Sequence, residues 1–176
     1  NWDKLDKVLD ILRQERANDL QVTADRYPYV ESMTQLSIML PAPYDSMPDA
    51  RIEQELKDND KFDLLVKELA EYQVERWGNV RLVSTAYDKL ISFIGQPLSE
   101  IAEQVGVPPF ILCAEAVRSN STGTMAAFSG MSDGNLKKIL ASDFVCCGSD
   151  ESARPQSYSF GRSHPRGFGS FPRFVN

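Results

Sequence analysis

The sequence predicts an α/β fold, a partial TIM-like (β/α) barrel in which short strands alternate with amphipathic helices. Residues 2–16 place leucine and valine at helical spacing, and they precede a short apolar segment at residues 20–24 that Pro28 ends. Residues 132–141 repeat the helical pattern before a second apolar run at residues 144–147. Helix, turn and strand in this order form one unit of a barrel wall, so we expect the two strands to lie parallel in one sheet.

Prolines and glycines set off the middle of the chain as a separate part. Pro41, Pro43 and Pro48 interrupt the chain at its start, and residues 106–109 combine glycine and proline at its end. Between them, residues 51–77 show the spacing of an amphipathic helix, which predicts a mainly helical insertion outside the barrel wall. The expected organisation is residues 1–35 as a barrel helix and strand, 36–108 as the helical insertion lobe, and 109–176 as the last barrel helices, strands and active-site loop.

Shorter patterns predict the remaining elements. Strands are expected at residues 80–84 and 124–128, and helices at residues 98–105 and 110–118. From residue 152 onward the sequence is rich in glycine, serine, proline and arginine, which predicts a long loop.

The composition is that of an ordinary globular domain. The chain has 176 residues, of which 42% are hydrophobic, enough for one good core. No apolar run approaches the ~20 residues of a membrane-spanning helix, and the amino end has neither the basic start nor the apolar core of a signal peptide. Two of the three cysteines are adjacent and none has metal-ligand spacing, so we expect reduced core thiols in a cytoplasmic protein.

The charge is divided unevenly along the chain. All 25 acidic residues lie at or before Glu151, whereas four arginines follow it. An acidic body repels nucleic acid, and an arginine cluster can receive a small anion, so a carboxylate-bearing metabolite is favoured. Residues 97–118 superficially resemble a helix-turn-helix, but Arg118 is the only basic residue of the second helix. The tail could instead be an RNA-binding segment, although its His-Pro-Arg and Phe-Pro-Arg elements fit a structured loop better.

Asp150 is the strongest candidate for a catalytic residue. The run at 144–147 is typical of a strand buried on both faces, and Gly148 and Ser149 end it just before Asp150. Catalytic groups of α/β barrels lie at the carboxyl ends of the strands. A carboxylate there can hold a divalent metal, or can accept a proton from metal-bound water and pass it to a leaving amine. The alternative is an aspartate that only stabilises the turn.

Several segments together resemble one enzyme family. Residues 164–173 read His-Pro-Arg-Gly-Phe-Gly-Ser-Phe-Pro-Arg, and they follow the Gly-Ser-Asp of residues 148–150. Residues 20–29, 95–106 and 131–136 supply further matches in the same order and at approximately the same spacing. The chain thereby resembles the N-acyl-D-amino-acid deacylases (D-aminoacylases), a branch of the metal-dependent amidohydrolase superfamily. The resemblance implies an amidohydrolase-type barrel, zinc or another divalent metal, and an N-acyl-D-amino acid as substrate.

The resemblance also implies roles for three residues, and the residues around His164 suggest a role for a fourth. Asp150 falls on the catalytic aspartate, which carries a proton to the leaving nitrogen and could also contact the metal. Arg166 and Tyr27 fall on residues that contact the α-carboxylate of the substrate, and both side chains suit that task chemically. His164 stands between a serine and a proline in an arginine-rich loop, so we expect it to orient the loop rather than to bind metal.

Most of the family's metal ligands have no counterpart here. The resemblance implies a metal site built from an upstream His-x-His pair, a cysteine and two later histidines, whereas this sequence has a single histidine. We therefore expect the chain to be a fragment of the catalytic barrel that neither holds zinc tightly nor turns over alone, and whose cut edges favour self-association. A cyclic-amide hydrolase of the dihydroorotase or hydantoinase kind, and a catalytically inactive binding or scaffold fragment, remain as alternatives.

Overall fold

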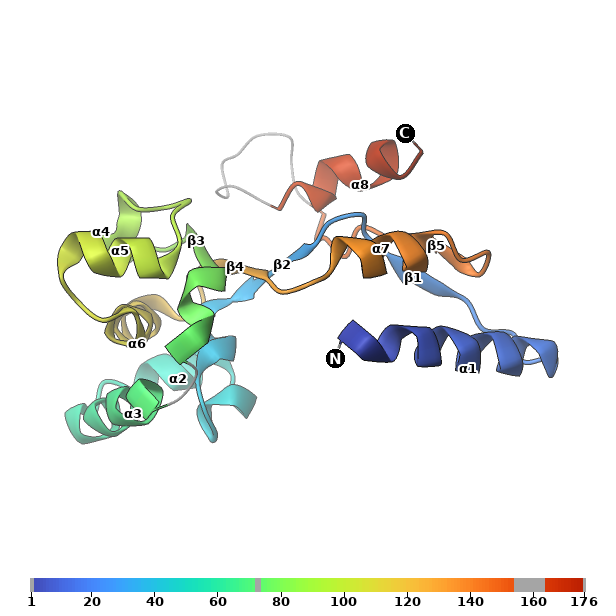
Figure 1. Ribbon diagram of the computed structural model, residues 1–176. Coiled ribbons are helices and arrows are strands. Elements are labelled where there is room, and N and C mark those ends of the chain that lie inside the picture. The colour runs from blue at the N-terminus through green and yellow to red at the C-terminus, as the bar shows by residue number, and fades with distance from the viewer. Residues whose placement is uncertain (1, 72–73, 154–163, 176) are drawn as a thin grey trace. The chain divides into compact units, whose positions relative to one another are not determined.

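The computed structural model describes residues 2–71, 74–153 and 164–175, and the chain divides into two compact units (Figure 1). Unit 1 is built from the residues up to 31 together with those from 130 onward, and unit 2 comprises residues 32–129. Within the described ranges, no helix has both the length and the apolar character needed to cross a membrane.

Unit 1 contains a small parallel sheet and the helices that flank it in sequence. Its elements are η1 (Trp2–Lys4), α1 (Leu5–Ala17), β1 (Ala24–Arg26), α7 (Asp133–Leu140), β5 (Val145–Cys147) and α8 (Arg166–Val175). Strands β1 and β5 pair in parallel, with Ala24 opposite Val145 and Arg26 opposite Cys147. The predicted parallel pairing is therefore confirmed. The α/β class is confirmed as well, whereas the described residues form no closed barrel and the partial barrel stays a prediction.

Two details of this sheet differ from expectation. The first strand covers residues 24–26 rather than 20–24, because the ladder begins where the Ala24 N–H donates to the Phe144 carbonyl, at 3.0 Å. The second strand is not buried on both faces, since Cys146 is exposed and Cys147 only half-buried. The expectation of three core cysteines thus holds for Cys113 alone, and all three thiols are free.

The end of the chain forms a helix where a loop was expected. Helix α8 spans Arg166–Val175 and includes Pro172. It buries Arg166 and Ser170, one turn apart, whereas Phe168 and Phe171 are exposed. Contacts on the buried face therefore outweigh the weak helix propensity of its glycines and proline. Arg154 and Arg162 of the expected arginine cluster lie outside the described residues.

Unit 2 is mainly helical, with one three-stranded sheet in the order β2-β4-β3. Its elements are β2 (Glu31–Gln35), η2 (Leu36–Met39), η3 (Tyr44–Ser46), α2 (Asp49–Glu55), α3 (Asn59–Glu71), η4 (Val74–Asn79), β3 (Val80–Ser84), α4 (Asp88–Ile91), α5 (Leu98–Val105), α6 (Pro109–Asn120) and β4 (Met125–Ser129). Strands β3 and β4 are antiparallel, with Leu82 opposite Ala126. Strand β2 was not anticipated from the sequence.

Helices α3 and α6 supply much of the unit 2 core. Leu65 and Leu69 of α3 are buried one turn apart, as their spacing predicts. The single helix expected over residues 51–77 is divided, because the Asp58 carboxylate accepts the Asp60 backbone N–H at 2.9 Å and begins a new helix there. Helix α6 packs against α2, α3 and α5. Unit 2 extends to residue 129 and includes α6 and β4, and the insertion over residues 36–108 stays a prediction.

Candidate functional site

The candidate site of unit 1 lies where β1 and β5 end. Tyr27 directly follows β1, and Asp150 comes three residues after β5. Because these strands are parallel, their carboxyl ends meet at the same edge of the sheet. Asp150 has a φ of 48°, a left-handed conformation that aspartate tolerates better than most side chains. Two residues predicted from distant parts of the sequence are thereby placed at one edge.

Arg166 connects these two residues. Its Nη1 lies 3.0 Å from Oδ2 of Asp150, and its guanidinium carbon lies 4.9 Å from the centre of the Tyr27 ring. The Arg166 side chain is only 8% exposed, whereas that of Asp150 is 67% exposed. The arginine is therefore held in a fixed environment, and the aspartate is the partner with freedom to turn away.

Glu151 is a site residue that sequence reasoning missed. Its Oε2 lies 3.4 Å from Nε of Arg166, and its side chain is 6% exposed. A buried carboxylate needs a charge partner, and the Arg166 guanidinium is that partner for Glu151. Arg166 is in turn held by a second carboxylate besides Asp150. The position of Glu151 next to Asp150 carries no sequence signal of burial, so this role is visible only in the structure.

His164 packs between two tyrosines behind Arg166. The centre of its ring lies 6.0 Å from that of Tyr27 and 5.3 Å from that of Tyr29. Its Nδ1 accepts the backbone N–H of Arg166 at 3.0 Å. Burial, reinforced by the positive charge of Arg166, lowers the pKa of His164 below the ordinary 6.5. A neutral imidazole is needed to accept that N–H, and the loop-orienting role of His164 stays a prediction.

Two glycines allow α8 to approach this cluster closely. A Cβ at position 167 would lie 2.8 Å from Cγ of Glu151, and a Cβ at position 169 would lie 2.2 Å from the Tyr29 hydroxyl oxygen. Any larger residue at either position would force the partner side chain to shift. The absence of side chains at Gly167 and Gly169 therefore allows the helix that carries Arg166 to pack against Glu151 and Tyr29.

A metal centre is not assembled by the part of the chain that the structure describes. No group of three His, Cys, Asp or Glu side chains there is placed to hold a metal ion. Asp150 has Arg166 as its charged neighbour rather than a second ligand group. The residues at hand are suited to anion binding and proton transfer, and they do not fit a complete zinc site.

The low pKa of His164 predicts an acid-sensitive unit 1. The unfolded chain takes up a proton near pH 6.5, whereas the folded imidazole resists it, so the folded state loses stability as the pH falls below that value toward the folded pKa. We expect the parent protein to lose more protection of its α8 amides against hydrogen exchange between about pH 7.5 and about pH 5.5 than His164→Gln does. Equal losses in the two proteins would exclude His164 as the titrating group, since it is the only histidine in the chain.

Comparison with solved structures gives strong matches to one kind of enzyme. An N-acyl-D-glutamate deacylase from Bordetella bronchiseptica, complexed with zinc and a phosphonate inhibitor, superposes with a TM-score of 0.59 at 21% sequence identity over 97% of this chain. A D-aminoacylase described as defining a novel subset of amidohydrolases gives 0.58 at 21% over 98%, and a D-aminoacylase studied for its binuclear metal centre gives 0.59 at 21% over 98%. No family model matches the chain. No curated protein sequence matches it either.

The chain spans 27% of the length of each of these three structures. At 21% identity the likeness concerns the fold, and for the fold it confirms the resemblance that the motifs predicted. The chain has the fold of a segment of the D-aminoacylase and N-acyl-D-glutamate deacylase structures.

Proposed function

We propose that this chain supplies the carboxylate-binding and proton-transfer residues of a hydrolase that releases D-amino acids from N-acyl-D-amino acids. The single observation that carries the proposal is the ion pair between Asp150 and the buried Arg166 at the carboxyl edge of the parallel sheet. The fold shared with deacylase structures supports the same reaction class.

Arg166 is the proposed anchor for the α-carboxylate of the substrate. Its planar guanidinium matches a carboxylate with two parallel hydrogen bonds, and its burial strengthens such a pair. Glu151 and the ring of Tyr27 hold the guanidinium from other sides. An incoming carboxylate therefore takes the place of the exposed Asp150 side chain rather than that of Glu151.

Asp150 is the proposed proton carrier. Displaced from Arg166 by the substrate, its carboxylate can accept a proton from the attacking water and deliver it to the leaving nitrogen. Asp150 is therefore free to transfer a proton only after the substrate carboxylate has replaced it at Arg166. Zinc or another divalent ion in the complete enzyme would need ligands that the described residues do not supply, so the roles proposed for this chain are confined to its own side chains.

The anchor is tested by Arg166→Lys in an active enzyme that contains this chain. Lysine keeps the charge but loses the planar fork, so we expect KM for an N-acyl-D-amino acid to rise by roughly tenfold or more, with a smaller change in kcat. Arg173→Lys is the matched control, because Arg173 lies on the same helix over the Tyr29 ring and has no proposed contact with substrate. An unchanged KM in Arg166→Lys would remove Arg166 from the substrate site.

A further inference from the structure

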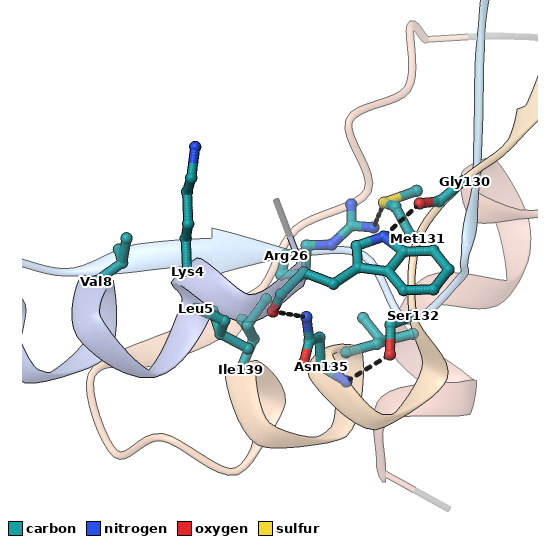
Figure 2. A pocket seen from close by; sticks show the side chains of 11 residues that line it. Lys4, Leu5, Val8, Arg26, Gly130, Met131, Ser132, Asn135 and Ile139 are labelled. Carbon is teal, nitrogen blue, oxygen red and sulfur yellow. Dashed lines mark hydrogen bonds between the residues drawn. The ribbon is translucent and has the colours of Figure 1, made fainter.

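Unit 1 contains an open groove between α1 and α7, separate from the candidate site at the ends of β1 and β5. We call it the α1–α7 groove; its volume is about 520 Å³. Leu5 and Val8 of α1 lie on one side, and Ile139 of α7 lies on the other (Figure 2). Trp2 and Leu136 also line the groove. Val8 is 48% exposed and Trp2 is 63% exposed, so apolar surface is accessible to a ligand.

Hydrogen bonds hold the two sides of this groove together. The Trp2 indole N–H donates to the Gly130 carbonyl at 2.8 Å, and the Asn135 side-chain amide donates to the Trp2 carbonyl at 2.8 Å (Figure 2). An ion pair of 2.9 Å between Lys138 and Asp6 joins the same two helices. The groove therefore has a defined shape before any ligand arrives, which lowers the entropic cost of binding.

The charged groups of the groove are all cationic. Arg26 and Lys4 line it, and no lining residue is acidic. The Arg26 guanidinium stacks on the Tyr27 ring at 3.8 Å and donates to the Tyr29 carbonyl at 3.0 Å and to Met131. Neither cation forms an ion pair with a carboxylate in the described parts of the chain, whereas the nearby Asp133 is matched by Lys137.

We propose that the α1–α7 groove binds a small amphipathic carboxylate, such as a medium-chain fatty acid. The carboxylate would pair with Arg26, and the hydrocarbon chain would lie along Leu5 and Ile139. The volume is within the range of small-molecule sites, and an apolar lining with a few convergent polar groups is their usual composition. A cation without a charge partner favours an anionic head group over a neutral or positive one.

This site is separate from the proposed catalytic one but adjoins it through Tyr27. The Tyr27 ring is contacted by Arg26 at 3.8 Å and by Arg166 at 4.9 Å. Ligand in the groove needs neither Arg166 nor Asp150, so the inference does not rest on the proposed function. Binding can therefore be measured in this chain whether or not it takes part in catalysis.

The test is a titration of the chain with octanoate, followed by the NMR signal of the Trp2 indole. We expect saturable binding in the millimolar range, and binding of octanol that is about tenfold weaker or less because it lacks the charge. Val8→Asp places a carboxylate at an exposed position of the groove, so it should abolish octanoate binding without loss of the fold. Arg26→Gln should weaken binding by about tenfold. Arg13→Gln is the matched control, because Arg13 is exposed on α1 and pairs with Asp10 outside the groove.

Three results would overturn the proposal. The first is no octanoate binding to the parent chain, and the second is equal binding of octanol and octanoate. The third is that Val8→Asp, with circular dichroism unchanged, binds octanoate as the parent does. If octanoate fails to bind while Val8→Asp turns a self-associated chain into a monomer by sedimentation, the groove is occupied by a second copy and the small-ligand proposal is wrong.

Discussion

Asp150→Asn should lower the turnover of an N-acyl-D-amino acid by roughly 100-fold or more without raising KM, because a neutral side chain competes less with the substrate carboxylate for Arg166. The amide keeps the size of the side chain and its contact distance to Arg166, but it cannot carry a proton. The measurement is steady-state kinetics of an active enzyme that contains this chain. Asp143→Asn is the control, because Asp143 is exposed at the other end of β5. Turnover within a few-fold of the parent would remove Asp150 from the chemistry.

Leu65→Ala should destabilise unit 2 by about 3 kcal/mol, because truncation of a fully buried leucine leaves a cavity in the core. Leu65 is 0% exposed, whereas the adjacent Leu64 is 57% exposed. Leu64→Ala is the control, because it makes the same leucine-to-alanine change without leaving a cavity, and it should lower the free energy of unfolding by less than about 0.5 kcal/mol. Denaturant unfolding followed by the fluorescence of Trp77, which is 4% exposed in this core, measures both. Equal effects of the two substitutions would show that α3 does not pack as described.

The sheet of unit 1 shows what periodicity can and cannot predict. Helix followed by strand, twice, was sufficient for the parallel pairing of β1 and β5, because handedness and connection length leave few other arrangements. The register was not predictable, since the apolar residues that precede Ala24 mimic a strand without forming ladder hydrogen bonds. Exposure of Cys146 was missed for a related reason: a short apolar run does not reveal which faces are covered.

Helix α8 was not predictable from local sequence, because glycine and proline within it disfavour helix. In the folded chain Glu151 lies close to Gly167 and Tyr29 lies close to Gly169, and local sequence does not show these contacts. The division between α2 and α3 was easier to predict from the sequence, because aspartate is a favoured helix N-capping residue and Asp58 directly precedes α3.

The candidate site also contains residues that the sequence predicted and one that it did not. Tyr27, Asp150, His164 and Arg166 were predicted from motifs, and the structure brings all four together. Their chemical roles stay predictions. Glu151 was missed because a carboxylate beside a stronger candidate has no sequence signature of burial, and its importance follows from the position of the Arg166 side chain.

The proposed hydrolysis is tested most directly by the release of free amino acid from matched N-acyl-D- and N-acyl-L-amino acids, by an active enzyme that contains this chain. We expect release from the D substrate, preference for D over L, and loss of this activity in Asp150→Asn. Opening of a cyclic amide such as a hydantoin without release from either linear substrate, or no hydrolysis of any of them, would contradict it.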